Sequence, residues 1–342
     1  MREFVDPLGD WPCPPPPGYR GQLDGGFQRD RAALYEGVGE GDCAWYHSTE
    51  LPTGLRHGQW DLRGREAAYL GGVDLAGRRV LELGPASGHL TFFMEAQGAD
   101  VTAFEVGYDA RIAMVPAASG TDVDALEAGL MQHTRRTVNA WWYLHRLNGS
   151  CAKMVHGDIR RLPDDIGTYD VVVLGSILLH CRDFPMVLME AAAHAADAVV
   201  VTEPYHRELD SGTRLMCFLP QPDQRQPSVT WWRFSPAAVA SMLWRLGFTR
   251  PSLHHHSQAY RDEAGAWSEV PYFTVVAARA SAPATEVPGW LSEPAAAAPD
   301  GAAGLLADNQ RLNAQLQAVL SSRTVRWTAP ARRIYRRMRP PG

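Results

Sequence analysis

The chain has 342 residues, of which 45% are hydrophobic and 21% charged, values typical of a globular protein. They exclude a collagen-like or coiled-coil fibre and a chain disordered throughout, and no run approaches the ~20 consecutive apolar residues that cross a bilayer. The N-terminus lacks the layout of a signal peptide, and the five cysteines stand singly, without a CxxC pair. We therefore expect a protein of the reducing cytosol.

The net charge of -5 is unevenly distributed along the chain. Eight arginines and no acidic residue follow Asp308, so that residues 1–308 carry a charge of -13. Nucleic-acid binders owe most of their affinity to neutralised phosphates, and such an acidic body disfavours a large RNA partner unless the basic C-terminus supplies the contacts.

The first predicted elements are an extended arm and short helices. Proline and glycine dominate residues 1–25, and helical segments follow around 30–35 and 63–70. From residue 79 to 278, short apolar runs alternate with segments of helix length, which is typical of a parallel sheet covered by helices. We expect strands at residues 79–83, 101–105, 153–156, 170–174, 198–202 and 272–278.

Two helical segments have further features. Ser235 is an N-cap followed by proline in the first turn, and Gly247 supplies the stop of the last long helix. An insertion at 122–147 has helical spacing in its second half, which contains Trp141 and Trp142. These two tryptophans either pack in the core or place one indole over a bound ligand.

The sequence changes character after residue 280. Residues 281–304 have the Ala, Pro and Gly composition of a linker. Residues 305–321 then show the spacing of a coiled-coil seam, with Asn309 at a position where a buried Asn sets register. A homodimer through residues 305–320 is compatible with this pattern, although two heptads are too few to hold it alone.

Residues 80–88, Val-Leu-Glu-Leu-Gly-Pro-Ala-Ser-Gly, join an apolar strand to an amphipathic helix. Gly84 and Gly88 let the backbone pass close to a ligand, while the helix N-terminus turns free N–H groups toward it. Glu105 ends the next strand, where a carboxylate can accept both hydroxyls of a ribose. A dinucleotide site would show GxGxxG, whereas the spacing here is GxxxG with Glu82 two residues before it. We therefore expect a nucleoside ligand that is not a dinucleotide.

The run ELGPASG resembles the first motif of class I S-adenosylmethionine-dependent methyltransferases, and three further motifs follow in the family's order. They are the acid after the second strand, Gly-Asp-Ile after the third, and residues 169–180, which resemble the fourth-strand motif. The resemblance covers residues 79–278. It implies an α/β, Rossmann-like methyltransferase fold with a mostly parallel seven-stranded sheet and helices on both faces, and S-adenosyl-L-methionine as cofactor.

The resemblance also implies roles for single residues. The acid of the first strand orients the methionine end of the cofactor, that of the second binds the ribose, that of the third holds the adenine with the next backbone N–H, and the fourth-strand backbone meets the methionine amine. The expected cofactor-binding residues are Glu82, Gly84, Ala86, Ser87, Gly88, Glu105, Asp158, Ile159, Gly175 and Ser176.

A narrower resemblance extends upstream. Residues 45–52 and 58–61 look like the stretch that precedes the catalytic domain in methyltransferases related to the tRNA wobble-uridine carboxymethyl-transferring enzyme, and residues 178–183 and 230–233 fit that subgroup as well. The subgroup's basic TPGW is replaced by RHGQW at 56–60, which departs from a tRNA enzyme. The expected lid and substrate residues are Tyr46, His47, Trp60, Asp61, Trp231 and Trp232.

Methyl transfer from a sulfonium is an in-line displacement, so alignment and exclusion of water dominate, with a base where the acceptor is a hydroxyl. The catalytic candidates at the C-terminal edge of the sheet are His180, Glu203 and His206. His180 ranks first as the base, and the alternative is that it caps or packs the following helix. The run of histidines at 254–256 is not a metal site, because neighbouring strand residues point to opposite faces, and no metal is expected.

Residues 322–342 resemble the "S-W-R-x-T-x-P-x-R" tails of bacterial enzymes that act on surface polysaccharides. Arginines beside aromatic anchors fit an anionic membrane surface, at about 1 kcal/mol per basic residue, and a solvated end is the alternative.

We expect a cytoplasmic enzyme, peripheral at the inner face of the cell membrane, that O-methylates a sugar hydroxyl in a glycan, polysaccharide or glycosylated metabolite. The alternatives are a tRNA wobble-nucleoside methyltransferase, a natural-product tailoring enzyme and a non-catalytic cofactor-binding scaffold. The expected organisation is an N-terminal arm and helical lid (1–75), a methyltransferase domain (76–280), a linker (281–304), a coiled-coil-like helix (305–321) and a basic tail (322–342).

Overall fold

A computed structural model describes residues 31–106, 114–115, 122–163, 166–210, 214–221, 228–280 and 287–292. The predicted extended arm, most of the linker, the coiled-coil-like helix at 305–321 and the basic tail at 322–342 lie outside the described residues, and they stay predictions. Within the described part, no helix is both long and apolar enough to cross a membrane.

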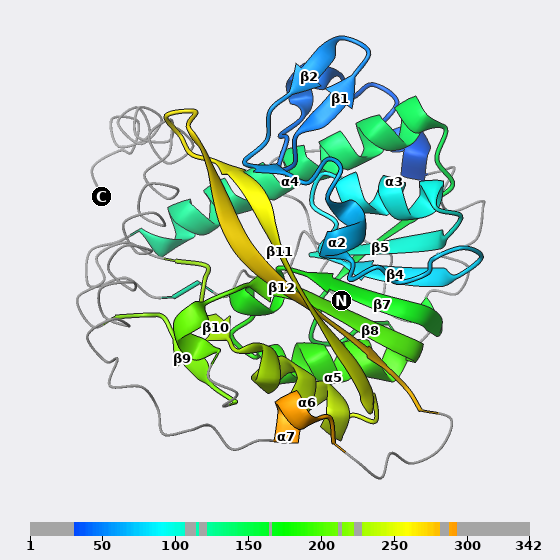
Figure 1. Cartoon of the computed structure of the whole chain (residues 1–342). Coiled ribbons are helices and arrows are strands. Elements are labelled where there is room, and N and C mark those ends of the chain that lie inside the picture. Colours follow the sequence, from blue (N-terminus) through cyan, green and yellow to red (C-terminus); the bar gives the residue numbers. More distant parts are fainter. Residues whose placement is uncertain are drawn as a thin grey trace, which may run out of the picture.

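An eight-stranded sheet forms the centre of the molecule, in the order β3-β11-β12-β8-β7-β4-β5-β6 (Figure 1). The strands from β4 to β8 pair in parallel, whereas β11 and β12 run antiparallel to their neighbours. The expected mostly parallel sheet is therefore confirmed. The strands are β3 (Trp60–Asp61), β4 (Arg79–Leu83), β5 (Asp100–Val106), β6 (Lys153–Gly157), β7 (Tyr169–Gly175), β8 (Ala195–Pro204), β11 (Arg250–Arg261) and β12 (Trp267–Ala278).

The eighth strand comes from the N-terminal lid. Strand β3 has only two residues, and it pairs with Ala259 and Tyr260 of β11, so that a segment far upstream joins the edge of the sheet. All six strands expected from apolar runs are present, and β4 has the predicted bounds.

Helices cover both faces of the sheet (Figure 1). The helices α3 (His89–Ala96) and α4 (Val123–Asn148) pack on one face, and α5 (Phe184–His194) and α6 (Pro236–Arg245) on the other. The remaining elements are short: α2 (Glu66–Tyr69), α7 (Gly289–Ser292), the 3-10 turns η1 (Glu40–Asp42), η3 (Leu178–His180) and η4 (Arg207–Leu209), and the two-stranded pairs β1 (Thr49–Leu51) with β2 (Gly54–Arg56) and β9 (Met216–Phe218) with β10 (Trp232–Phe234).

The helix ends follow from local chemistry. The Ser235 hydroxyl accepts a hydrogen bond from the backbone N–H of Ala238, as expected for the N-cap of α6. Helix α4 spans the whole insertion, because Asp122 caps its first turn and Gly149 ends it in the left-handed conformation. The sequence had indicated a helix only for the second half of that insertion.

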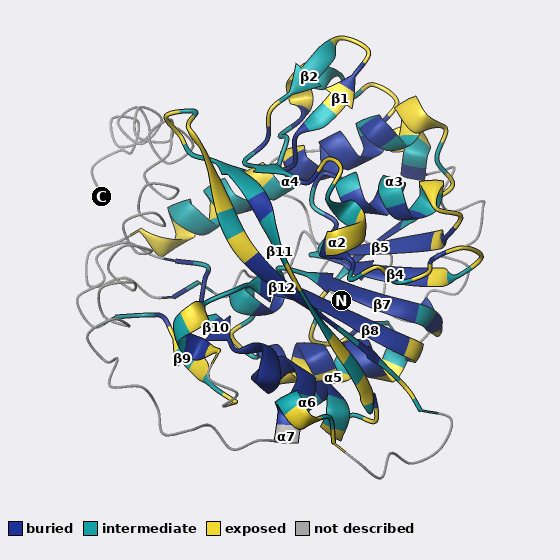
Figure 2. Cartoon of the chain, viewed as in Figure 1, coloured by how far each residue is buried: buried dark blue, intermediate teal, exposed yellow. Residues whose placement is uncertain are grey.

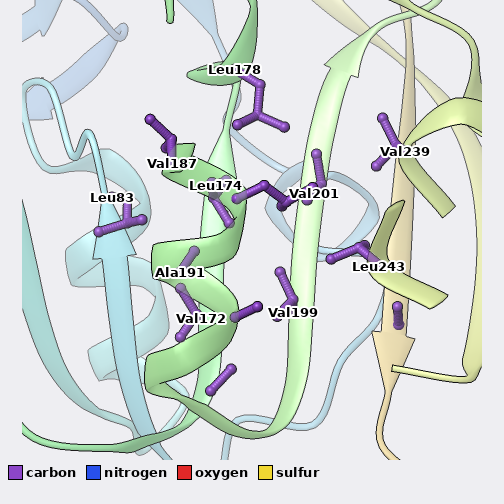
Figure 3. Packing of buried hydrophobic residues seen from close by; sticks show 14 of the residues in the cluster. Leu83, Val172, Leu174, Leu178, Val187, Ala191, Val199, Val201, Val239 and Leu243 are labelled. Atoms are coloured by element: carbon purple, nitrogen blue, oxygen red, sulfur yellow. The ribbon is translucent and has the colours of Figure 1, made fainter. Parts of the chain in front are cut away.

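The core has two halves because the strands alternate their side chains between the faces. Leu83, Leu174 and Val201 face α5 and α6, where they meet Val187 and Leu243 (Figure 3). On the other face a second cluster, which includes residues of β4 and β7, packs against α3 and α4. Figure 2 shows the central strands buried, whereas the β1–β2 hairpin and much of the β11–β12 ribbon are more exposed. The buried sheet therefore presents the carboxyl ends of its parallel strands on a rigid support.

Candidate active site

The loop between β4 and α3 is held in a conformation that favours glycine. Gly84 and Gly88 have φ angles of +78° and +88°, and Ala86, between them, has a φ of +49°. A Cβ on Gly88 would lie 2.6 Å from Phe92 and 2.7 Å from Trp141, so no side chain fits there. Strained non-glycine backbone is found where surrounding structure enforces it, often at ligand sites. The predicted glycine loop is thus present and tightly supported.

A chain of hydrogen bonds supports Glu82 beneath this loop. The hydroxyl of Thr91, on α3, donates to the Glu82 carboxylate, and the indole N–H of Trp141 donates to the Thr91 hydroxyl at 3.1 Å. Trp141 and Trp142 are both almost fully buried, with 0% and 2% exposed. The two tryptophans are therefore core residues, and Trp141 supports the site through Thr91 and through its packing against Gly88.

Two carboxyl groups with perturbed pKa values lie at the carboxyl ends of β4 and β5. Burial raises the pKa of Glu82 to about 7, against the hydrogen bond from Thr91, and the charge of Glu105 adds to the rise. Burial also raises the pKa of Glu105 to about 7, although the backbone N–H groups of Val106 and Ala86 donate to it. A positively charged ligand between these groups would favour their ionised forms.

Asp158 and Ile159 follow β6 at the same edge of the sheet, as predicted. The Asp158 side chain is 44% exposed and forms an ion pair with Arg160 at 2.7 Å, which lowers its pKa. Ile159 is half-buried against the core. Because Arg160 occupies the carboxylate, the adenine contact expected of Asp158 stays a prediction.

The loop after β7 meets the first helix of the lid. Ser176 has a φ of +53°, and its hydroxyl lies 3.0 Å from the hydroxyl of Tyr69, on α2. A Cβ on Gly175 would lie 3.0 Å from the Tyr69 ring. The predicted pair at 175–176 is therefore in direct contact with Tyr69.

The N-terminal lid is docked on the glycine loop. The backbone N–H of His47 donates to the Ser87 hydroxyl at 3.2 Å, and Ser87 is fully buried. The hydroxyl of Ser87 thus bonds the lid, and the predicted cofactor contact of this residue stays a prediction. Burial and the neighbouring His89 hold the pKa of His47 well below its usual value, and His47 Nδ1 has no partner among the described residues. Asp61, also assigned to the lid, pairs with Arg63 at 2.7 Å.

These segments line a pocket that is partly open to solvent. Eight of the predicted site residues line it, and the others do not. Those that do not are Ser87, Gly88, Glu105, Asp158, Ile159, Asp61, Trp231, Trp232, His180, Glu203 and His206. The lining residues are Tyr46, His47, Trp60, Leu62, Tyr69, Glu82, Leu83, Gly84, Pro85, Ala86, Leu90, Gly175, Ser176, Gln258 and Tyr272.

Tyr69, Gln258 and Tyr272 were missed by the sequence analysis. Tyr272 begins the last predicted strand, and Gln258 lies in a polar stretch with no apolar run, so no local pattern marks either residue as part of the pocket. Both reach it because the β11–β12 ribbon pairs with the lid through β3. Only the tertiary fold reveals them.

His180 stands in η3, four residues beyond Ser176. Its Nδ1 lies 2.9 Å from the carbonyl oxygen of Val229, and burial lowers its pKa. A carbonyl only accepts, so Nδ1 carries the proton and Nε2 keeps a lone pair. Nε2 has no partner among the described residues. His180 does not line the pocket described above, but it lies on the loop that forms one of its walls.

Glu203 and His206, the other two catalytic candidates, have largely buried side chains. Glu203 is 1% exposed, and one of its oxygens accepts from the backbone N–H groups of Leu178 and Leu179, so it fastens the turn that carries His180. Burial raises the pKa of Glu203 to about 8. Burial, helped by Arg233, lowers the pKa of His206 to about 3. The geometry gives Glu203 a positioning contact with the η3 backbone.

The predicted substrate residues Trp231 and Trp232 lie beside η3. The backbone N–H of Trp231 donates to the carbonyl of Leu179 at 2.8 Å, and the indole N–H of Trp232 donates to the backbone carbonyl of Arg182 at 3.2 Å. Phe218, which is 52% exposed, packs on Trp232 with 5.3 Å between the ring centroids. An aromatic surface thus adjoins His180, outside the pocket.

The three consecutive histidines do not converge. His254 bonds Ser252, His255 packs on Tyr205, and His256 bonds Thr274. In the part of the chain that is described, no group of three or more His, Cys, Asp or Glu side chains could hold a metal ion.

Comparison with known proteins identifies the class. Residues 56–252, more than half of the chain, match a family model described as a methyltransferase domain. The chain therefore belongs to this family of methyltransferases, and it is an S-adenosylmethionine-dependent enzyme. The strained loops, the paired carboxyl groups and the aromatic pocket fit this cationic nucleoside. No curated protein matches the sequence.

Solved structures with a similar fold include the N-terminal domain of EvdMO1, crystallised in the presence of SAH and D-fucose (18% identity, TM-score 0.44, 75% of this chain and 96% of that one). A second is 1,6-didemethyltoxoflavin-N1-methyltransferase of Burkholderia thailandensis (17% identity, TM-score 0.39, 65% of this chain and 82% of that one). A third is magnesium protoporphyrin IX methyltransferase of Synechocystis PCC 6803 (14% identity, TM-score 0.38, 64% of this chain and 82% of that one). These identities and scores are too low to transfer a substrate.

Proposed function

We propose that the protein is an O-methyltransferase whose acceptor is a sugar hydroxyl. The bound cofactor supplies a methyl group on a sulfonium, which is already an activated leaving group. A sugar hydroxyl does not ionise near neutral pH, so its methylation needs a base within hydrogen-bonding distance. The protein's part is therefore to hold the cofactor, align the acceptor and accept one proton.

The observation that carries the proposal is the state of His180. Its Nδ1 proton is fixed by the Val229 carbonyl, its lowered pKa keeps the ring neutral, and Nε2 is left to accept a proton. The turn that carries it is fastened by Glu203. A neutral imidazole with one unused lone pair is the form that general-base catalysis requires.

The surface beside His180 supports a carbohydrate acceptor. Trp232 and Phe218 form a partly exposed aromatic face next to the turn that carries the histidine. Aromatic rings with polar groups at their edges suit ligands that are apolar on one face and rich in hydroxyls at the rim, as sugars are.

The proposal is tested by a methyl-transfer assay on offered glycosides, with mass spectrometry to detect the gain of one methyl group. The variant His180→Gln should lower kcat by roughly 100- to 10,000-fold. Its affinity for S-adenosylhomocysteine should stay unchanged. In the wild type, kcat at saturating cofactor should rise with pH through a pKa below 6.5 and then level off, because only the neutral ring accepts a proton.

His194→Gln is the matched control, since His194 Nδ1 also bonds a backbone carbonyl, that of Gly167, at 2.7 Å. It should keep full activity. If His180→Gln keeps both its rate and its pH profile, His180 only packs the turn and the base assignment is wrong. If no glycoside gains a methyl group while another acceptor class does, the sugar proposal fails.

The remaining predictions concern partners. Membrane contact through residues 322–342 and a homodimer through 305–320 stay predictions, as does the cytoplasmic location. A non-catalytic scaffold would bind the cofactor without turnover on any acceptor, so the same assay separates it from an enzyme. The acidic charge of residues 1–308 supports a neutral acceptor over a tRNA.

A further inference from the structure

Gln258 is a buried polar side chain whose function the methyltransferase fold does not explain. It lies on β11, it is 0% exposed, and it lines the same pocket as Glu82. Its Oε1 has no hydrogen-bond partner among the described residues. A buried acceptor without a donor is unfavourable, so such an atom in a pocket indicates a ligand group that donates to it.

A relay of hydrogen bonds links the Gln258 amide to Thr274. The hydroxyls of Thr274 and Thr202 both lie within hydrogen-bonding distance of the Tyr69 carbonyl, at 2.8 Å and 2.7 Å, and 2.9 Å from each other. When Thr274 donates to Tyr69 or to Thr202, it accepts from His256 Nε2 at 3.0 Å. His256 Nδ1 is then the lone-pair nitrogen, and it accepts from the Gln258 amide nitrogen at 2.9 Å. With the nitrogen bound to His256, the oxygen is the free atom of the amide.

His256 stays neutral, so that one of its ring nitrogens keeps a lone pair. Burial, helped by the two preceding histidines, lowers the pKa of His256 to about 4. The ring also stacks on Tyr272, with 5.9 Å between the centroids. With Nδ1 as the lone-pair nitrogen, the Gln258 oxygen is the acceptor left without a partner among the described residues.

The surroundings of Gln258 in the pocket favour a cation. Trp60 and Tyr69 pack on Tyr272 with centroid distances of 5.6 Å and 6.0 Å, and all three line the pocket. Glu82 adds a carboxyl group. Among the described residues that line the pocket, none is lysine or arginine, so no side chain there competes with a cationic group for the Gln258 oxygen. Aromatic faces, a carboxylate and an amide oxygen together suit an ammonium group.

We propose that Gln258 Oε1 accepts a hydrogen bond from the α-ammonium group of the methionyl half of S-adenosylmethionine, and that His256 positions it. This inference rests on the assignment of the pocket to the cofactor. It adds a polar contact from the β11–β12 ribbon, which already contributes Tyr272, to a site built mainly by β4, β7 and the lid.

The test compares two ligands that share the thioadenosine group. S-adenosylhomocysteine has the amino-acid group, and 5′-methylthioadenosine lacks it. In calorimetric titrations, Gln258→Leu should lower the affinity for S-adenosylhomocysteine by roughly 10- to 100-fold. The affinity for 5′-methylthioadenosine should stay unchanged. Gln258→Glu keeps an acceptor oxygen and should retain the affinity for S-adenosylhomocysteine. Gln97→Leu, an exposed glutamine on the far end of α3, is the control and should change neither ligand.

The unchanged affinity for 5′-methylthioadenosine also shows that the variant is folded. Equal losses for both ligands in Gln258→Leu, or no loss for either, would overturn the proposal. A raised KM for the acceptor with unchanged S-adenosylhomocysteine binding would do the same, because Gln258 would then bind the acceptor. If Glu82→Gln weakens S-adenosylhomocysteine while Gln258→Leu does not, the pocket assignment stands and only the role of Gln258 fails. If neither variant weakens it, the cofactor lies elsewhere.

Discussion

Replacing Glu82 by Gln should make the ligand-free protein more stable at alkaline pH while it weakens cofactor binding. Glu82 is 3% exposed, and burial raises its pKa from 4.5 to about 7. A carboxyl group whose pKa is raised on folding stabilises the protein fully below pH 4.5. That contribution is lost as the pH rises through 7, because the folded state must then hold a buried charge.

The size of the effect follows from that shift. A rise from 4.5 to about 7, at 1.36 kcal/mol for each pKa unit, amounts to about 3 kcal/mol at pH 8. At pH 5, where the unfolded group is only partly ionised, the difference is about 1 kcal/mol. The neutral Gln escapes this cost, and its amide oxygen can still accept from Thr91. The Glu82→Gln protein should therefore gain most of its advantage between pH 5 and pH 8.

Urea denaturation of both proteins at pH 5 and pH 8, with and without S-adenosylhomocysteine, measures this effect. The variant should unfold at higher urea at pH 8, and the ligand should stabilise the wild type more than the variant. Glu190→Gln is the control, since Glu190 lies outside the pocket and likewise accepts a hydrogen bond, from the backbone N–H of Leu162. A variant that is equally or less stable than the wild type at pH 8 would refute the assignment of a buried, destabilising carboxylate.

Three further predictions concern the loop, the ligand and the tail. S-adenosylhomocysteine binding should tighten from pH 6 to pH 8 and release protons, because its ammonium group favours the ionised forms of Glu82 and Glu105, whose pKa values are about 7. Titrations in buffers of different ionisation enthalpy measure the number of protons released. Proton uptake on binding would contradict this prediction. Gly88→Ala should abolish binding and cost roughly 1–3 kcal/mol of stability through its contact with Trp141. Gly72 also has a positive φ, but a Cβ there would meet open space, so Gly72→Ala should keep binding. If both variants lose binding equally, backbone strain and not the contact with Trp141 explains the loss. Deleting residues 322–342 should abolish binding to vesicles of anionic lipid, and undiminished binding would show that the tail is not the anchor.

Much of the fold could be predicted because its strands are continuous apolar runs. Buried parallel strands such as β4 and β7 show this signal in the sequence. Strand β11 could not be predicted in the same way, because it lies near the edge of the sheet and most of its residues are only partly buried. The two-residue β3 has no sequence signal, since only its pairing with β11 makes it a strand.

The residues of the site form the same two groups, those with a local sequence signal and those that depend on contacts between distant segments. The glycine loop and Glu82 could be predicted because a loop with left-handed backbone between a strand and a helix requires residues of particular types at particular spacings. Ser87 fits the motif by its position, and its bond to the lid has no signal in the sequence; its cofactor contact stays a prediction. Tyr69 and Gln258 depend on contacts between distant segments, and a contact of this kind leaves no local pattern.

The most direct test of the cofactor site is a crystal structure of the protein with S-adenosylhomocysteine. We expect the methionyl half between the glycine loop and the lid, with the ribose near Glu105 at the end of β5. Electron density for the compound in any other place, with the pocket beneath Tyr46 and Trp60 left empty, would contradict the proposed site.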